Sequence, residues 1–209
     1  MNPRTSEAEP LPAFVFVGGR PCLDLVDTLG KRGTLDIERL PTPERLGRWL
    51  REVGLANKPP LVSEDELDQA RKLREAIYRL VRCVLDGTRP DRHALAVINR
   101  MAAVADLAPR LEVATASGTS PLTARWPTPT PVGAALSTLA RDGIDLLSGP
   151  LAARVKECES PDCTLVFLDD SQARRRRWCS MDRCGNLAKI AKYRSRGRDA
   201  TSSDGAADR

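Results

Sequence analysis

Four of the six cysteines form two pairs with the same internal spacing. Four residues separate Cys158 from Cys163 and Cys179 from Cys184, and fifteen residues lie between the pairs. Each pair places two thiols on one tight turn, and the loop between them brings the two turns together, as in structural four-thiolate zinc sites. We therefore predict that these four cysteines bind one Zn²⁺ ion, with no open coordination position for catalysis. An iron–sulfur cluster stays the alternative, because it also takes four thiolates.

The positive charge of the chain is concentrated around these cysteines. The net charge is +5. Residues 154–198 contain 12 Lys or Arg and 6 Asp or Glu, whereas residues 1–153 contain 20 and 19, and residues 199–209 contain 1 and 3. A basic segment beside a nearly neutral remainder favours a polyanionic partner over charge used only for solubility.

Two groups of residues supply this charge. Four consecutive arginines precede the second cysteine pair, and the segment Gly185–Arg196 has the pattern of a helix with a basic side and an apolar side. We expect the apolar side, with Leu187 and Ile190, to pack onto the cysteine turns. The residues expected to contact DNA are Arg174, Arg175, Arg176, Arg177, Lys189, Lys192, Tyr193 and Arg196. In this interpretation the arginines bind phosphates and the helix enters or follows the major groove.

The same residues carry a resemblance to a known family. The stretch RRRRWCSMDRCGNLAKIAKYRSR resembles the CGNR-type zinc finger, which has a Cys-Gly-Asn-Arg signature at its last ligand and a basic helix after it. Upstream, PCLDLVDT resembles the start of the ABATE domain that commonly precedes this finger. Leu187 stands where the signature has arginine, and Asp27 where the ABATE start usually has asparagine. The resemblance implies a bacterial transcription regulator with a four-cysteine zinc site and DNA as its partner.

The elements that must position these residues are mostly helices. Capping residues and apolar periodicity predict helices over 21–30, 42–54, 63–87, from about Pro90 to 109 and over 132–149, with a short helix from Pro150 into Cys158. Ala13–Gly19 is typical of a strand, and residues 110–126 predict a β-hairpin around Ser117-Gly118. The predicted fold is mainly α with a short strand and a β-hairpin: a helical N-terminal domain and a small four-cysteine zinc finger followed by a basic helix.

The expected organisation has four parts. Residues 1–12 are predicted to form a flexible arm, 13–150 an ABATE-like regulatory domain, 151–198 the zinc finger and 199–209 a disordered tail. The regulatory domain would sense an unknown small-molecule or protein signal, self-associate as a homo-oligomer, or both. No apolar run of 18 residues and no signal-peptide pattern are present, so we expect a cytoplasmic protein with no membrane partner.

Other functions are less well supported by the residues. His93 is the only histidine and lies among polar residues, and no nucleophile–base pair accompanies it, so we expect no enzyme. Cys22 and Cys83 are expected to be buried, and Asp24 and Asp27 to act as caps or in internal ion pairs. The alternative to DNA binding is a zinc-stabilised protein-interaction module whose arginines meet an acidic protein. No residue excludes RNA as the nucleic acid.

Overall fold

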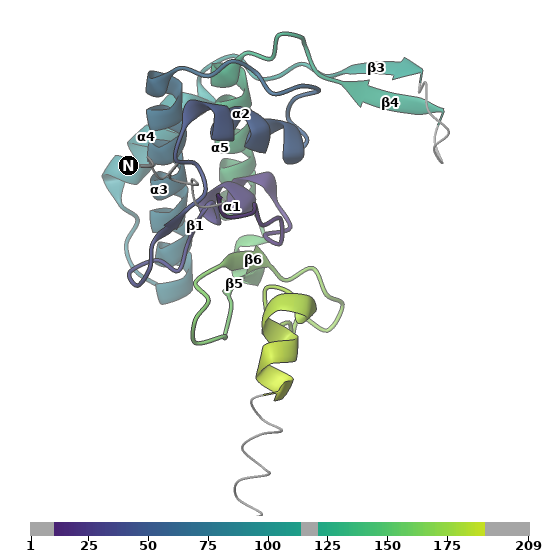
Figure 1. Cartoon of the computed structure of the whole chain (residues 1–209). Coiled ribbons are helices and arrows are strands. Elements are labelled where there is room, and N and C mark those ends of the chain that lie inside the picture. The colour runs from purple at the N-terminus through teal and green to yellow at the C-terminus, as the bar shows by residue number, and fades with distance from the viewer. Residues whose placement is uncertain (1–10, 114–120, 191–209) are drawn as a thin grey trace, which may run out of the picture.

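A computed structural model describes residues 11–113 and 121–190 (Figure 1). The described chain is mainly helical, as predicted, with three small antiparallel hairpins. The helices are α1 Pro21–Val26, α2 Pro43–Glu52, α3 Glu64–Asp86, α4 Arg92–Ala102 and α5 Val132–Ser148. The strand pairs are β1 Leu29–Gly30 with β2 Ile37–Glu38, β3 Arg110–Val113 with β4 Leu122–Arg125, and β5 Val155–Glu157 with β6 Val166–Leu168. A 3₁₀ turn, η1 Ala152–Arg154, precedes β5, and a π-helical turn, η2 Met181–Gly185, begins the last helix.

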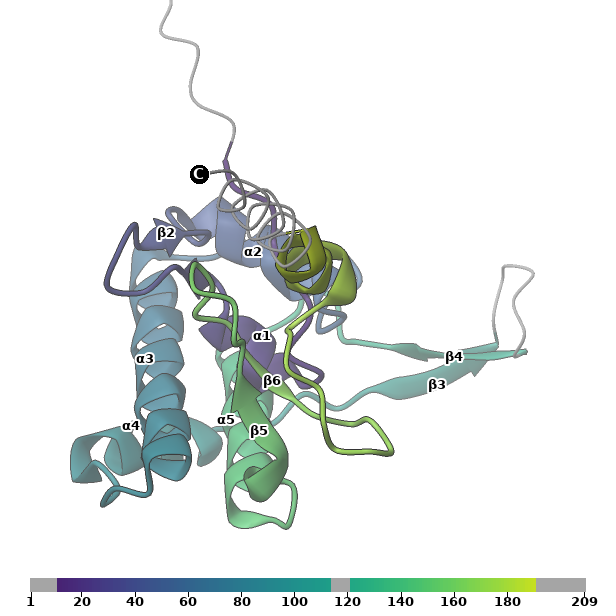
Figure 2. The same ribbon diagram turned by 90° about the horizontal axis from the view of Figure 1, so that it is seen from below.

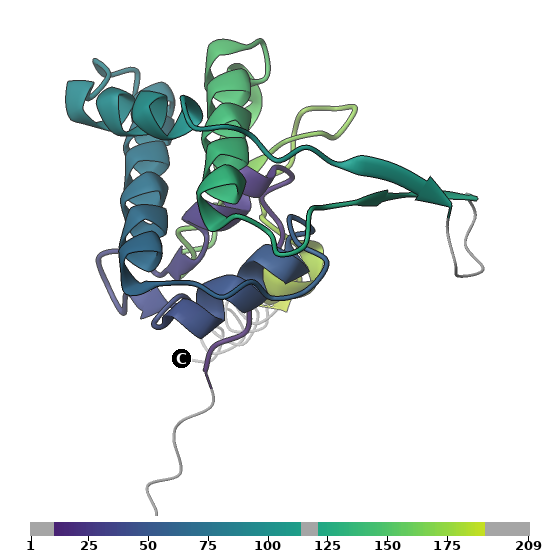
Figure 3. The ribbon, with the colours of Figure 1, turned by 90° about the horizontal axis from the view of Figure 1, so that it is seen from above.

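The long helices form a body around one apolar core (Figure 3). Helix α3 packs against α1, α4 and α5, and Leu23, Leu73 and Leu139 are fully buried between them. The predicted end signals are found in place. Thr42 caps α2, Ser63 and Glu66 form the capping box of α3, and Gly87 ends α3 with a φ of 64° in the left-handed region.

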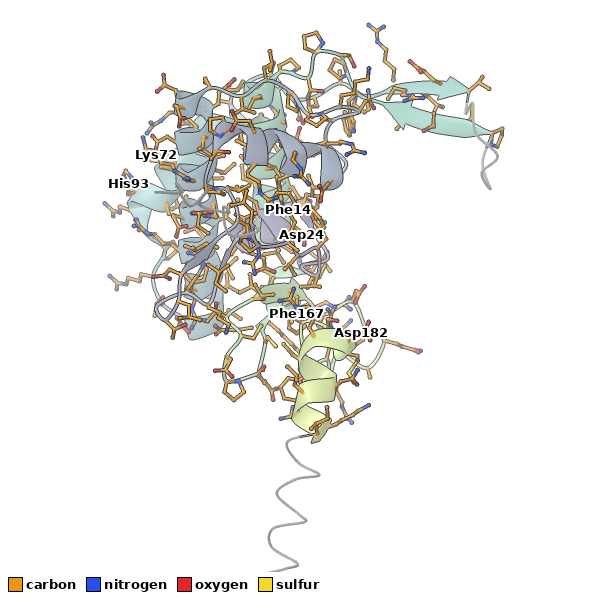
Figure 4. All side chains as sticks on the ribbon, viewed as in Figure 1. Phe14, Asp24, Lys72, His93, Phe167 and Asp182 are labelled. Carbon is orange, nitrogen blue, oxygen red and sulfur yellow. The ribbon has the colours of Figure 1, made fainter. Side chains whose placement is uncertain are left out.

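The cysteine segment shares its packing with the N-terminal part of the chain. Val155, Val166 and Leu168 of the β5–β6 hairpin belong to the large core of the helical body. A second apolar cluster joins Val15 to Phe167 and to three of the paired cysteines. Figure 4 shows Phe167 between the helical body and Asp182 at the start of the last helix. The boundary expected near residue 150 stays a prediction, but residues on both sides of it are packed together.

Two predicted elements are wrong. The strand expected over Ala13–Gly19 is absent, because arginine side chains hydrogen-bond to carbonyl groups at its start: Arg39 Nε donates to Ala13 O at 2.9 Å, and Arg45 Nη2 donates to the preceding Pro12 O at 2.6 Å. The helix expected from Pro150 into Cys158 is only the turn η1, after which the chain enters β5. The expected arm, up to residue 10, the hairpin turn at 114–120 and the tail lie outside the described residues.

The β3–β4 hairpin projects from the helical body in every view (Figures 1, 2 and 3). It is anchored at its base by Trp126, which packs against the core and donates from its indole N–H to Gly54 O at 2.6 Å. Among the described helices, none combines the length and the apolar character needed to cross a bilayer.

Candidate metal centre and its basic surface

The four paired cysteines converge on one point. Their sulfur atoms all lie within 4.8 Å of one another. The Sγ atoms of Cys163 and Cys179 are 3.8 Å apart, and those of Cys179 and Cys184 are 3.6 Å apart. Tetrahedral zinc with Zn–S bonds of about 2.3 Å separates its sulfurs by about 3.8 Å, whereas a disulfide needs about 2.05 Å. The donor set and its spacing therefore suit a single zinc ion and do not fit a disulfide.

Local hydrogen bonds place the first pair. Cys158 follows β5, and its N–H donates to Leu165 O at 2.9 Å, which closes the β5–β6 hairpin over the first turn. Cys163 lies at the end of that turn, with its N–H on Ser160 O at 2.9 Å. The hairpin itself is held in the helical core, so this turn has a rigid base.

The second pair is placed by η2. The N–H groups of Cys184 and Gly185 both donate to Ser180 O at 3.1 Å, and the Ser180 side chain accepts from Asp182 N–H at 3.2 Å. This wide turn carries Cys184 back toward Cys179. A Cβ at position 185 would lie 2.5 Å from Met181 Sδ and 3.3 Å from the Trp178 ring, so only glycine fits without displacement of these side chains.

The sulfurs cannot all carry a negative charge without a cation. A hydrogen bond from Cys179, assisted by the N–H of Leu165, lowers the pKa of Cys163 to about 5. Burial raises the pKa of Cys184 to about 11, and the hydrogen bond to Cys163 together with burial raises the pKa of Cys179 even further. One thiolate is therefore stable next to protonated neighbours, and a divalent cation is needed to stabilise four. When bound, zinc would supply a fixed tetrahedral cross-link, further stabilised by the N–H of Cys179 on Cys158 Sγ at 3.4 Å.

The four consecutive arginines have different environments. The guanidinium of Arg176 points inward, where it donates to Trp178 O at 3.0 Å and to the carbonyl of Cys179, and it lies over the Phe167 ring at 4.3 Å. Arg177 pairs with Glu159 at 2.5 Å and lies over Trp178 at 5.0 Å. Arg174 and Arg175 are exposed, and within the described chain neither side chain makes an ion pair. Only these two are therefore fully available to a partner.

Asp169 organises the arginine loop, which the sequence reasoning missed. Its side chain is fully buried and accepts from Lys156 Nζ at 2.6 Å, from Ser171 and from the N–H of Arg176 at 3.0 Å. Lys156 also donates to the carbonyl groups of Arg174 and Arg176. The Asp-x-Ser sequence was a usable signal, since Asp commonly bonds the backbone two residues on.

The last helix does not pack as predicted. Leu187 is 63 % exposed and Ile190 48 %, and in η2 and residues 186–190 only Cys184 and Gly185 are buried. The helix points away from the body because the π-turn directs it outward (Figure 1). Lys189 is exposed on it. Lys192, Tyr193 and Arg196 lie outside the described residues.

Two aspartates of the N-terminal part hold this region in place. Asp24 accepts from Gly18 N–H at 2.9 Å, and Asp27 Oδ1 accepts from Val166 N–H in β6 at 3.1 Å. Burial raises the pKa of Asp24 to about 6 and the pKa of Asp27 well above its usual range. Oδ2 of Asp27 is buried without a hydrogen-bond partner in the described structure. Both act as internal caps, and Asp27 joins the end of α1 to the cysteine hairpin.

The remaining candidates lie away from the sulfurs. Cys22 and Cys83 are buried, as expected. His93 is exposed at the start of α4, and Figure 4 shows it with Lys72 on the outer side of the helical body.

Comparison with known protein families assigns most of the chain. The family model ABATE, described as a putative stress-induced transcription regulator, matches residues 19–150. The model for the CGNR zinc finger matches residues 154–197. None of the curated proteins compared with the chain matches it.

Proposed function

Since the chain belongs to the ABATE family of putative stress-induced transcription regulators and carries a CGNR zinc finger, we propose that it binds DNA through the finger. Zinc holds the two cysteine turns together and so fixes the arginine loop and the last helix relative to each other. The exposed pair Arg174 and Arg175, on the loop that leads into the second cysteine turn, is the observation that carries the proposal.

The charges of the finger support a phosphate-binding role. Arg174 and Arg175 have no carboxylate of the described chain in ion-pair distance, and Lys189 is exposed on the neighbouring helix. The loop backbone is fixed by Asp169 and Lys156, so the two arginines extend from a rigid base. Arginine binds a phosphate through two N–H groups at once, which suits such a position. Lys192, Tyr193 and Arg196, which lie outside the described residues, remain predicted contacts.

The test is the salt dependence of binding to a random-sequence duplex. Each phosphate contact adds about 0.9 to the slope of log K against log salt, so Arg174→Ala with Arg175→Ala should lower the slope by about 1.8. The matched control is Arg89→Ala with Arg100→Ala, which removes two exposed arginines from the helical body. An unchanged slope in the finger variant, with zinc content intact, would refute the proposal.

A protein-interaction module is the second candidate, and the exposed apolar residues of the last helix favour it. Leu187 and Ile190 offer an apolar surface that a partner helix or groove could cover. If zinc-loaded protein binds no duplex even at low salt, this candidate replaces the first. Acidic peptides and duplex DNA tested on the same preparation separate the two.

We also propose that the N-terminal part self-associates through the β3–β4 hairpin. Leu111 and Val113 are 72 % and 74 % exposed and lie on one face of the hairpin, opposite Ala124 and Leu122, while Arg110, Glu112 and Arg125 lie on the other face. A two-stranded hairpin has little stability of its own, so a covered apolar face is expected.

A second copy of the chain is the occupant that fits. A groove of about 210 Å³ between α3, α4 and α5 is lined by Leu80, Leu95, Ile98, Ile144 and Leu147 and by no charged residue. In a twofold dimer each copy's hairpin would enter the other's groove. Each copy would contribute eight hairpin residues and eight groove residues to the interface. A standard interface has about 20–30 residues on each side, so the dimer should be weak.

Sedimentation of wild type and of Leu111→Ser with Val113→Ser tests this interface. The wild type should form dimers in the micromolar range, and the variant should stay monomeric to higher concentration. Glu112→Ser, on the opposite face of β3, is the control. A wild type that stays monomeric throughout, or a variant that dimerises equally well, would exclude the hairpin.

A further inference from the structure

A pocket lies where the N-terminal part meets the zinc finger. Its volume is about 670 Å³, within the range of about 300–1,000 Å³ typical of small-molecule sites. Three segments line it: the β1–β2 hairpin, the first cysteine turn at residues 160–165, and the start of the last helix from Arg183 to Ala188. Residues matched to both families therefore form one cavity.

Three cations face this pocket. They are Lys31, Arg39 and Arg183; the negative groups of the lining are Asp162 and the zinc-binding sulfurs of Cys163 and Cys184. No ion pair joins any of the three cations to a carboxylate of the described chain. Burial, and then the charge of Arg183, lower the pKa of Arg39. The charges of Asp27, Glu38 and Cys163 act in the opposite direction but do not restore it, so an anion bound between the two guanidinium groups is favoured.

The position of Arg39 is built into the fold. The residue is 6 % exposed, and its Nε and Nη1 donate to the carbonyl groups of Ala13 at 2.9 Å and Asp27 at 3.2 Å. A Cβ on Gly30 would lie 2.5 Å from Arg39 Nη1, so glycine is needed beside the guanidinium. These bonds go to neutral carbonyl groups, and they orient the guanidinium without neutralising it.

One part of the wall is apolar, and Ser160 and Thr164 add polar groups to the first cysteine turn. Ile37, Pro161, Leu165 and Leu187 line the pocket beside the cations. Leu187 occupies the position where the CGNR signature has arginine, so in this chain that part of the wall is apolar instead of charged. A ligand that matches both the cations and the apolar wall of the pocket has one acid group and an apolar body.

We propose that this pocket binds a small organic anion, with its acid group between Arg39 and Arg183 and its apolar body against Leu165 and Leu187. Arg39 belongs to the N-terminal part and Arg183 to the last helix, so the ligand ties the helix to the body. The role of this site as a signal input rests on the proposed regulator function. If the ligand prefers one position of the last helix, its binding changes the affinity for DNA, and DNA binding changes the affinity for the ligand by the same factor.

The test uses zinc-loaded full-length protein and three probes in calorimetry. The probes are 2-naphthoate, which has charge and an apolar body, 2-naphthalenemethanol, which has the body alone, and inorganic phosphate, which has charge alone. Naphthoate should bind at least tenfold more tightly than either of the others. Arg183→Ala should weaken naphthoate at least tenfold, and Leu187→Ala should weaken naphthoate several-fold without a change for phosphate. Arg89→Ala, an exposed arginine outside the pocket lining, should match the wild type.

Several results would overturn the proposal. Equal binding of naphthoate and the alcohol would mean that the acid group is not recognised. If Arg183→Ala loses zinc and not the ligand, the cations serve only to balance the charge of the zinc thiolates. If duplex DNA displaces naphthoate competitively, the anion of this pocket is a DNA phosphate and not a separate signal. Naphthoate binding in a protein that binds no DNA would refute the proposed function alone and leave the site standing.

Discussion

Arg176→Ala should destabilise the zinc finger region, whereas Arg175→Ala should not, although the two residues are adjacent in a run of four arginines. Arg176 donates to the carbonyl groups of Trp178 and Cys179 and lies over Phe167. Loss of the donors leaves a buried carbonyl unpaired at a cost of about 1–3 kcal/mol, and loss of the cation–π contact costs about 0.5–1 kcal/mol. We expect a destabilisation of about 2–4 kcal/mol for Arg176→Ala, and a change within about 0.5 kcal/mol for Arg175→Ala.

The assay is urea unfolding of the zinc-loaded protein, followed by tryptophan fluorescence, with zinc release measured by a chromogenic chelator in the same titration. Trp178 adjoins the second cysteine turn, whereas Trp49 and Trp126 belong to the helical body, so zinc release is the signal specific to the finger. Arg176→Lys keeps the charge and loses the planar fork, so it should fall between the two alanine variants. Equal unfolding midpoints for Arg175→Ala and Arg176→Ala would refute the inward assignment of Arg176. In this structure the inward Arg176 is not available to DNA, so Arg176→Ala does not test DNA contact. It would become a valid test only after such a result.

Three further predictions concern zinc and the buried aspartates. Removal of zinc with a chelator, or Cys179→Ser, should expose the β5–β6 hairpin to amide exchange, since three of the cysteines share an apolar cluster with Phe167. The far-ultraviolet circular dichroism signal of helices α3 to α5 should persist. Unchanged amide exchange at Val166 would contradict this prediction. Asp24→Asn should stabilise the protein at pH 8 by up to about 3 kcal/mol, about two pKa units at about 1.4 kcal/mol each. Because the folded pKa of about 6 lies above the unfolded value, the wild type loses stability as pH rises through this window, so the difference should vanish below about pH 4 in thermal melts. Asp27→Asn should likewise stabilise at neutral pH, while Asp27→Ala should destabilise by about 1–3 kcal/mol, because Val166 N–H then loses its acceptor; equal melting temperatures for the two variants would refute the capping role.

The helices could be predicted because their signals are local. Thr42, the Ser63 and Glu66 pair and Gly87 each act within one turn of a helix end, and all are found as expected. The β5–β6 hairpin could not be predicted, because its strands are three residues long and owe their place to the core of distant helices. The segment before α1 was misjudged for a related reason. Its composition favours a strand, but arginines from elsewhere in the chain take its carbonyl groups.

The clustering of the four paired cysteines could be predicted from the sequence, and the arrangement of the residues around them could not. The repeated spacing indicates two paired turns, and the structure brings their four sulfurs within 4.8 Å of one another. The buried carboxylate of Asp169 orients the loop and so decides which of the four arginines points inward. Four identical residues in a row give no sign of which one that is. The exposure of Leu187 could not be predicted either, because the periodicity of this segment does not say how the π-turn Met181–Gly185 orients the helix relative to the body.

Helix α1 connects the two functional regions. It packs against α3 and α5 in the helical body and against β6 of the finger, and its C-terminal Asp27 bonds Val166 in that strand. Arg39, which faces the pocket, donates to the carbonyl of the same Asp27. A ligand that draws Arg39 toward the last helix would therefore act on the end of α1 and on the base of the first cysteine turn together. In this proposal bound zinc would make the coupling effective, because a cross-linked pair of turns transmits a displacement that two independent turns would absorb.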